Sequence, residues 1–264
     1  MNIQPSLFDA VEGSGSDQSL PSARVLGGGL QIICLEGAHL AYFPGWLRQT
    51  EVLSTITSPR HQTPNEDMLA AKALVSTEAI FQALKKQVAW EQTSIRLYGK
   101  AVRIPRLNAW YAQPQYGYTY SGQYFTPHPW LSVLLSLKLA IEQQIQTALL
   151  ETSTSLTDGL LNSALVNCYR DGQDSVAWHS DDEPELGNHP TVASVSLGAE
   201  RIFQLRHKHH KGESYRYSLP LQDGDLLIMY GATQHNWQHQ LPKTRHKVGE
   251  RINITYRQVR HPRY

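Results

Sequence analysis

The sequence is poor in cysteine and lacks any long apolar run. Cys34 and Cys168 are the only cysteines among 264 residues. Two distant cysteines exclude a disulfide framework and a zinc site built from several thiolates. No stretch reaches the roughly 18 consecutive apolar residues that indicate a transmembrane helix, and the start, Met1–Pro5, lacks the basic-then-apolar pattern of a secretory signal. We therefore expect a cytoplasmic protein in a reducing environment, without a membrane partner.

A large net charge is also missing, because the formal value is only +1. The distribution is nevertheless uneven, since residues 201–264 contain 12 Lys and Arg against 4 Asp and Glu. The segment 94–106 has no acid and four cations, which are Arg96, Lys100, Arg103 and Arg106. Clustered cations bind polyanions because phosphate contacts release counterions, although a solvated basic face has the same composition. Charge favours a nucleic-acid partner without deciding it.

Composition divides the chain into a tail and one domain. Residues 1–30 are rich in Ser, Gly, Asp and Pro, a composition that buries no core, and they are predicted to be disordered. Residues 31–264 form the domain. Within it, residues 31–47 alternate apolar positions and end in turn residues, which predicts a strand and a turn. Residues 48–75 are polar without sustained periodicity and are predicted to be a mobile insertion.

Two helices are predicted in the first part of the domain. Ser76 or Thr77 can cap the first helix, and its apolar face is formed by Ile80, Phe81, Leu84 and Val88. The second helix begins at Pro129, a residue suited to the first turn, and continues to Ile145. Both helices are expected to cover the outer face of a sheet.

After about residue 160 the pattern changes to short alternating runs separated by turn residues. The runs are 164–169, 192–197, 202–206, 215–219, 225–230, 236–240 and 251–259. Many short strands at this spacing are typical of an antiparallel sandwich. The predicted fold is therefore mostly β, a jelly roll (double-stranded β-helix) with two supporting N-terminal helices.

The segment Trp178–Glu183 contains a histidine and a carboxylate at a spacing of two residues. In an extended strand the side chains of His179 and Asp181 project from the same face, so both can reach one metal ion. Two histidines and one carboxylate on one octahedral face leave three positions open for a co-substrate and oxygen. A His-x-Asp pair alone is common, and a second histidine is needed.

Several later residues could supply that second histidine. His235 and His239 both precede the last predicted strand, and spacing does not choose between them. The run His207–His210 also offers imidazoles, but it includes a lysine in a predicted loop, and we assign it to the surface.

The last predicted strand places four polar side chains on one face at a period of two. They are Arg251, Asn253, Thr255 and Arg257. Arginines inside a barrel are costly unless a ligand satisfies them, and a dicarboxylic acid would do so through paired hydrogen bonds. The alternative is an edge strand whose polar face meets water.

Six segments in order carry a resemblance to a known family. They are Asn167-x-Tyr169, His179-x-Asp181-Asp182-Glu183, Ser194–Gly198, Gly224–Met229, Trp237–Pro242 and Arg251-x-Asn253-x-Thr255-x-Arg257. Together they resemble the AlkB family of nucleic-acid dealkylating dioxygenases. The similarity runs from about Ile80 to Arg260 and is greatest to the branch of DNA-repair AlkB homologues.

The resemblance implies roles for the polar residues. His179, Asp181 and His239 would hold Fe(II), and His239 is implied because the family's distal ligand precedes a short turn with proline. The pocket for 2-oxoglutarate would be lined by Asn167, Tyr169, Arg251, Asn253 and Arg257. O2 would be the second co-substrate.

The resemblance also implies a nucleotide-recognition region at 94–125, which includes the family's substrate lid. Tyr120, with Tyr118 beside it, would stack on an extruded base. Tyr98 would fill the gap that the base leaves, while the cations of 94–106 hold phosphates. Asp182 and Glu183 would lie near the damaged base, with Glu183 accepting from its exocyclic nitrogen.

The implied reaction is oxidative demethylation of N1-methyladenine and N3-methylcytosine in DNA, a direct-reversal repair. Such bases are extruded at the least cost because the damage has already spoiled their pairing. Two alternatives stay open at this point. One is a dioxygenase of the same fold that acts on RNA or on protein side chains, and the other is a jelly-roll protein that binds nucleic acid without turnover.

The tail carries one further motif. Gln4–Phe8 resembles the Gln-x-x-Leu-Phe peptide by which bacterial repair proteins bind the sliding clamp. The hypothesis is that Leu7 and Phe8 dock in an apolar pocket of the clamp. We accordingly expect a monomer located in the bacterial cytosol or nucleoid.

Overall fold

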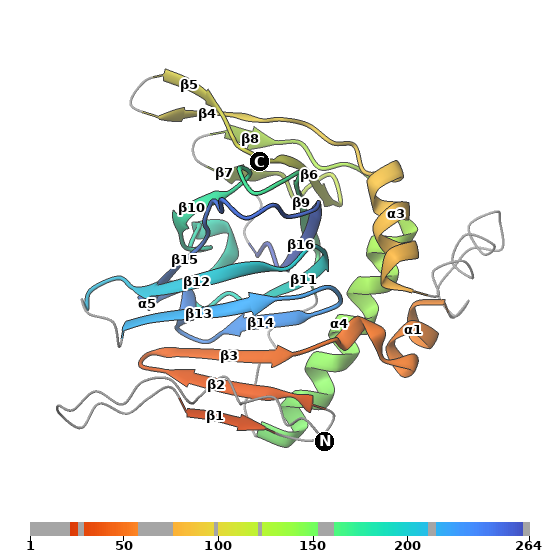
Figure 1. Ribbon diagram of the computed structural model, residues 1–264, viewed down its shortest axis with the longest axis vertical. Coiled ribbons are helices and arrows are strands. Elements are labelled where there is room, and N and C mark those ends of the chain that lie inside the picture. The colour runs from red at the N-terminus through yellow and green to blue at the C-terminus, as the bar shows by residue number, and fades with distance from the viewer. Residues whose placement is uncertain are drawn as a thin grey trace.

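Two antiparallel sheets contain most of the described strands (Figure 1). The structure is a computed structural model, and it describes residues 22–25, 29–57, 76–97, 100–120, 123–152, 161–210 and 215–260. The larger sheet has eight strands in the order β1 (Ser22–Val25), β2 (Gln31–Leu35), β3 (Ala38–Phe43), β14 (Leu226–Tyr230), β11 (Val192–Gly198), β16 (Arg251–Arg257), β9 (Ser163–Tyr169) and β6 (Leu107–Ala112). The smaller sheet has four strands in the order β10 (Val176–His179), β15 (Trp237–Leu241), β12 (Arg201–His207) and β13 (Arg216–Leu221). This sandwich confirms the predicted mostly β fold.

Two hairpins and several helices complete the described elements. The hairpins pair β4 (Ser94–Leu97) with β5 (Lys100–Arg103), and β7 (Tyr118–Tyr120) with β8 (Gln123–Phe125). The helices are α1 (Thr50–Thr57), α3 (Thr77–Gln87), α4 (Ser132–Thr152) and α5 (Thr233–Asn236), with 3-10 turns η2 (Trp46–Arg48) and η4 (Pro184–Leu186). None of the helices within these ranges is both long and apolar enough to span a bilayer.

The two predicted helices are present and pack against the larger sheet (Figure 1). Ser76 caps α3, and its hydroxyl accepts a hydrogen bond from the Ala79 N–H at 3.1 Å. The helix α4 begins at Ser132, three residues after the predicted start at Pro129. Apolar residues of both helices meet the even-numbered side chains of β16 and β9 in one core. The helices therefore cover the outer face of the larger sheet, and the opposite face of that sheet is directed into the interior of the sandwich.

The interior of the sandwich has an apolar half and a polar half. Side chains of β3, β12, β13 and β14 form a separate apolar cluster between the sheets. The odd-numbered side chains of β16 and β9, by contrast, are polar or aromatic and buried, apart from the half-buried Leu165. Because β16 lies between β11 and β9, its polar row does not face water, and the edge-strand alternative is wrong.

The structure corrects the predicted boundaries of the tail and the insertion. Ser22–Val25 forms strand β1 along β2, so this part of the predicted tail has regular structure. An edge strand can form backbone hydrogen bonds with its neighbour without burying apolar side chains, which is why the composition did not reveal it. Thr50–Thr57 is helix α1, and its Val52 and Ile56 are buried in the core with α4. Residues 58–75 and the peptide Gln4–Phe8 lie outside the described residues.

Candidate active site

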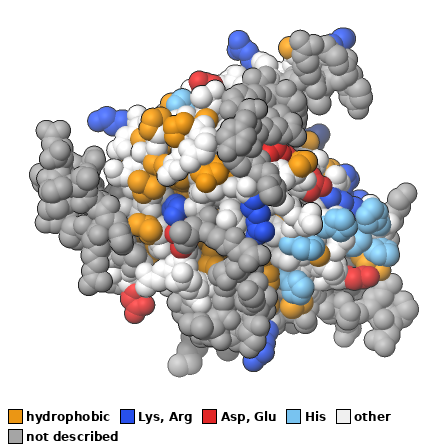
Figure 2. All heavy atoms as spheres, turned by 180° about the vertical axis from the view of Figure 1, so that it is seen from behind, with side chains coloured by type: hydrophobic (Ala, Val, Ile, Leu, Met, Phe, Trp, Pro, Cys, Tyr) orange, Lys and Arg blue, Asp and Glu red, His pale blue; other side chains and the backbone are white. Residues whose placement is uncertain are grey.

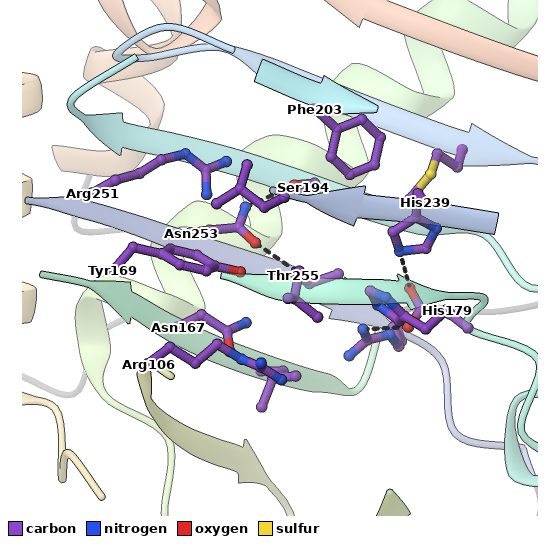
Figure 3. Close-up of a pocket in the computed structure, with 16 residues that line it drawn as sticks. Arg106, Asn167, Tyr169, His179, Ser194, Phe203, His239, Arg251, Asn253 and Thr255 are labelled. Atoms are coloured by element: carbon purple, nitrogen blue, oxygen red, sulfur yellow. Dashed lines mark hydrogen bonds and ion pairs between the residues drawn. The ribbon is translucent and has the colours of Figure 1, made fainter. Parts of the chain in front are cut away.

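Three side chains converge at one end of the sandwich interior. His179 is the last residue of β10, Asp181 follows two positions later, and His239 lies on β15. Their ligand atoms all lie within 4.8 Å of one another. The rings of His179 and His239 have centroids 4.2 Å apart, and His239 Nε2 is 3.8 Å from Asp181 Oδ2. Figure 3 shows the two imidazoles side by side at one end of the cavity.

The strand register decides which histidine joins the set. His239 pairs with His179 across β10 and β15, and its ring points into the sandwich, where it is only 5% exposed. His235 lies on α5 and is exposed. The histidines of the run His207–His210 belong neither to the metal-binding set nor to the residues that line the cavity in the described chain. Figure 2 shows histidines gathered on one side of the molecule near Lys and Arg side chains.

Hydrogen bonds and burial prepare these groups to bind a cation. His179 Nδ1 donates to the Ala177 carbonyl at 2.8 Å, which leaves Nε2 as the metal-binding nitrogen. Burial and, to a smaller extent, the adjacent His179 lower the pKa of His239 to about 3. Burial alone would raise the pKa of Asp181, but the positive charge and hydrogen bond of Arg257 bring it below its usual value. The set is therefore two neutral imidazoles and one carboxylate.

The donor set fits a divalent transition metal. Two imidazoles and one carboxylate are the facial triad of non-haem Fe(II) oxygenases, which leaves open coordination positions. Asp181 Oδ1 accepts a hydrogen bond from Arg257 at 2.7 Å. Its other oxygen, Oδ2, is buried and has no hydrogen-bond partner among the described residues. A cation bound between the imidazoles would satisfy that oxygen.

The polar row of β16 lines the cavity behind the triad, as the alternation predicts. Arg251, Asn253, Thr255 and Arg257 are all less than 9% exposed and all line the cavity. Asn253 Nδ2 donates to Ser194 Oγ at 2.8 Å and to the Val195 carbonyl at 3.0 Å. Thr255 Oγ1 donates in turn to Asn253 Oδ1 at 3.2 Å. These bonds lock the centre of the row.

Arg251 is a buried cation at the end of the cavity opposite the imidazoles (Figure 3). It is 2% exposed, donates to Ser196 Oγ at 2.9 Å, and lies 5.4 Å from the centre of the Tyr169 ring. Within the described chain, no carboxylate pairs with it and its Nε has no hydrogen-bond partner. Burial lowers its pKa to about 10. An incoming carboxylate would satisfy this guanidinium, so the residues present fit 2-oxoglutarate.

The cavity between Arg251 and the triad measures about 600 Å³, including solvent at its mouth. The predicted residues Asn167 and Tyr169 line it, on strand β9 beside β16.

The structure corrects the prediction that Arg106 holds DNA phosphates. Arg106 is 5% exposed, lines the cavity and donates to Asn167 Oδ1 at 3.0 Å. Its Nη1 also donates to the Ser175 carbonyl at 3.3 Å, and the Ser175 N–H donates to the Pro105 carbonyl, so contacts with this distant segment hold it inward.

Asp182 and Glu183 do not belong to the cavity lining among the described residues. Asp182 is exposed and forms an ion pair with Lys208 at 2.8 Å. Glu183 precedes the turn η4 and is half-buried. Their predicted contacts with a damaged base remain predictions.

The nucleotide-recognition region is described only in part. Tyr118 and Tyr120 lie on strand β7, but their side chains, the Arg96 side chain and the whole of Tyr98 lie outside the described residues. Lys100 and Arg103 are exposed on β5, as cations that contact phosphates must be. Their exposure agrees with the predicted contacts to phosphates, which remain a prediction.

Sequence reasoning missed several lining residues. The apolar wall includes Leu165, Val176, Phe203, Met229 and Leu241, and alternation within each strand could have identified these positions. Phe203 packs against the imidazole of His239, and the centroids of the two rings are 5.3 Å apart. Arg201 was also missed. It is 4% exposed and donates to the carbonyls of Asp171, Asp174 and Pro242, which ties two loops together beside Arg251.

The comparisons with known proteins agree with this geometry. Residues 40–257 match the family model of the 2OG-Fe(II) oxygenase superfamily. The chain is 42% identical over 193 residues to the mouse protein "Alpha-ketoglutarate-dependent dioxygenase alkB homolog 3", a match that covers 70% of this chain and 63% of that protein. It is 34% identical over 190 residues to the human "DNA oxidative demethylase ALKBH2", covering 69% of this chain and 68% of that protein.

Solved structures support the fold. The structure of OsALKBH1 superposes with a TM-score of 0.53 at 15% identity and covers 90% of this chain and all of that one. A 2OG-Fe(II) oxygenase family protein from Burkholderia pseudomallei gives a TM-score of 0.51 at 12% identity, covering 84% of this chain and 86% of that one. The two-sheet sandwich is thus the jelly roll that the sequence predicts. With the family model spanning most of its length, this chain belongs to the AlkB homologues of the 2OG-Fe(II) oxygenase superfamily.

Proposed function

We propose that the protein is an Fe(II)- and 2-oxoglutarate-dependent dioxygenase that removes alkyl groups from damaged bases in nucleic acid. The observation that carries the proposal is the arrangement of charges along one cavity. A metal-binding set of His179, Asp181 and His239 occupies one end, and the buried guanidinium of Arg251 occupies the other. This arrangement suits a co-substrate that binds a metal at one end and an arginine at the other.

Bound Fe(II), with 2-oxoglutarate and O2, would supply the oxidising equivalents that hydroxylate the alkyl carbon attached to the base nitrogen. The residues of the chain hold and orient the participants. Arg257 holds one oxygen of Asp181, and the Ala177 carbonyl fixes the ring of His179. Apolar neighbours such as Phe203 and Leu165 line the same cavity and limit the access of water. Hydroxylation at that carbon gives a hemiaminal, which releases an aldehyde and leaves the unmodified base.

Arg251 would bind the distal carboxylate of 2-oxoglutarate, because arginine donates paired hydrogen bonds to carboxylates. Tyr169, Asn167 and Asn253 line the space between this guanidinium and the metal set. Arg106 bonds to Asn167 and adds a further positive charge to the same wall. The cavity is therefore electropositive at the end where a dianion would lie.

Exposed cations support a nucleic-acid substrate. Lys100 and Arg103 project from β5. Residues 243–247 form a second basic stretch that contains exposed Lys243, Arg245 and Lys247, and no ion pair joins these three to any other part of the described chain. Phosphates supply the counter-charge that such a surface lacks.

The proposed substrates are N1-methyladenine and N3-methylcytosine in DNA. Extrusion of a base costs a few kcal/mol and is easiest where pairing is already lost, as it is for these two lesions. Tyr120 would stack on the extruded base, Tyr98 would occupy the gap in the strand, and Glu183 would accept from the exocyclic amine. The human relative is named a DNA oxidative demethylase, which favours DNA over RNA.

The deciding experiment is mass spectrometry of oligonucleotides with defined lesions after incubation with the iron-loaded protein. We expect loss of one methyl group from N1-methyladenine and N3-methylcytosine, with one equivalent of succinate and of formaldehyde per base. Matched RNA oligonucleotides and methylated peptides test the two alternative substrates. Succinate formation that no nucleic acid stimulates, with unchanged oligonucleotide masses, would contradict the proposal.

A further inference from the structure

Asp181 lies beyond the strand that delivers the first metal ligand. Strand β10 ends at His179, and its pairing with β15 is interrupted between Val176 and His179. The main chain of Asp181 is therefore not held by the sheet ladder. Its metal-facing position must be fixed by other groups, because a carboxylate ligand displaced by about 1 Å no longer presents its oxygen at bonding distance.

A buried glutamine provides that fixation. Gln234 on α5 is 1% exposed, and its Oε1 accepts a hydrogen bond from the Asp181 N–H at 2.9 Å. Its Nε2 donates to the sulfur of Met229 at 3.4 Å, so both ends of the amide have partners. The amide links the main chain of one metal-binding residue to the segment that leads into β15.

The neighbouring contacts strengthen the same connection. Ser180 Oγ donates to the Trp237 carbonyl at 2.8 Å, two residues before His239. Lys208 Nζ donates both to the Gln234 carbonyl at 2.9 Å and to Asp182 at 2.8 Å. The segment 180–182 is thus attached at three successive residues to α5, to the start of β15 and to Lys208.

The carboxylate of Asp181 is restrained from two sides. Arg257 binds its Oδ1, while Gln234 binds the N–H of the same residue. Together they leave Oδ2 directed toward His239 Nε2, at 3.8 Å. We propose that Gln234 is a positioning residue, which holds the main chain of Asp181 so that its free oxygen faces the metal. This inference rests on the metal site of the proposed function.

The test compares Mn(II) binding by the full chain and three variants. Gln234→Met keeps the length of the side chain and removes the acceptor, whereas Gln234→Glu keeps an oxygen at the same place. The control is Gln240→Met, because Gln240 lies beside His239 on the same strand and its amide bonds only to Gln204 among the described residues. Free Mn(II) is measured by electron paramagnetic resonance, and folding by circular dichroism and thermal melting without metal.

We expect Gln234→Met to weaken Mn(II) binding about 10-fold, the loss typical of groups that orient a metal ligand. Gln234→Glu should bind more tightly than Gln234→Met, and Gln240→Met should bind like the wild type even if its melting temperature falls. Should Gln234→Met fail to fold, Gln234→Asn, which is one methylene shorter, takes its place with the same expectation.

Equal Mn(II) affinity in the wild type and Gln234→Met would overturn the inference. An equal loss in Gln240→Met would do so as well, since the effect would then be general destabilisation. Absence of Mn(II) binding by the wild type would be a different result, because it would remove the metal site of the proposed function itself. The two failures are therefore distinguishable without measuring activity.

Discussion

Arg257 donates a hydrogen bond from Nη2 to Oδ1 of Asp181 at 2.7 Å, and both residues are no more than 3% exposed. The two charges neutralise one another inside the sandwich, which offsets the cost of burying each. The contact also occupies one carboxylate oxygen and leaves the other for a cation. An arginine on β16 thus determines which oxygen of Asp181 would be available to a metal ion.

The first prediction separates the two distal histidines. His239→Ala should abolish Mn(II) binding and formaldehyde release, because the triad loses one of its three donors. His235→Ala should retain both, since His235 is exposed on α5. Metal titration and a formaldehyde assay on methylated DNA measure the difference. Full activity of the His239 variant would refute the metal assignment.

The second prediction concerns the arginine at the far end of the cavity. Arg251→Lys should weaken 2-oxoglutarate binding about 10- to 100-fold, which corresponds to the loss of one charged hydrogen bond. Mn(II) affinity should stay unchanged, because Arg251 does not contact the triad. Calorimetric titration of the Mn(II)-loaded protein measures it. Arg216→Lys, on the exposed face of β13, is the control, and equal affinity in both variants would contradict the assignment.

The third prediction uses the salt dependence of DNA binding. Each lost phosphate contact lowers the slope of log K against log salt by about 0.9 for duplex DNA. Combined substitution Lys100→Ala and Arg103→Ala should therefore reduce the slope by about 1.8. Arg106→Ala should leave the slope unchanged and impair 2-oxoglutarate-dependent turnover, because Arg106 lies in the cavity wall. A reduced slope for Arg106→Ala would restore the original assignment of this residue to phosphate binding.

The fourth prediction concerns acid stability. Burial alone would raise the pKa of Asp174, but hydrogen bonds from the Arg170 side chain and backbone outweigh it and hold the pKa below the usual value of 3.8. Because the folded pKa is depressed, the stabilisation is present above about pH 4 and is lost as the pH falls through the folded pKa.

Asp174→Asn should accordingly lower the free energy of unfolding by about 1–2 kcal/mol at pH 7, given that Arg170 is partly exposed. The difference from the wild type should shrink toward pH 3. Urea unfolding at several pH values measures it, with Glu91→Gln at an exposed position as the control. A difference that does not depend on pH would rule out the charge as its origin.

The fifth prediction distinguishes the two cysteines. Burial, with a contribution from Glu250, raises the pKa of Cys168 to about 11, so its thiolate is scarce at neutral pH. Cys34 is exposed. A chromogenic disulfide reagent should titrate Cys34 alone in the native protein and both thiols in denaturant. Two variants serve as controls. The native Cys168→Ser variant should react to the same extent as the wild type, and the native Cys34→Ser variant should not react.

Local patterns predicted much of the site. Alternation along residues 251–257 places the polar row correctly, because side chains of a strand repeat every two residues whatever surrounds them. The His179 and Asp181 pair follows from the same rule, although Asp181 lies just past the strand end. The cap at Ser76 and the face of α3 were likewise readable from a few neighbouring residues.

Other features depend on contacts between distant segments. The choice of His239 rests on its pairing with His179 across two strands, which spacing does not encode. Arg106 has the same charge as Arg103, and its contacts with the distant residues Asn167 and Ser175 hold it inward. The helix α1 was missed because eight residues give too short a pattern to distinguish a helix from an irregular segment.

The Arg251 guanidinium has a wider consequence for handling the protein. Its charge is kept away from water, with a serine hydroxyl and a tyrosine ring as neighbours, and burying a charge in this way opposes folding. A bound dicarboxylate would relieve this opposition, and any ligand that prefers the native state adds about 2.7 kcal/mol at 100 times its dissociation constant. Storage and crystallisation with 2-oxoglutarate or an unreactive analogue should therefore lengthen the lifetime of the folded chain.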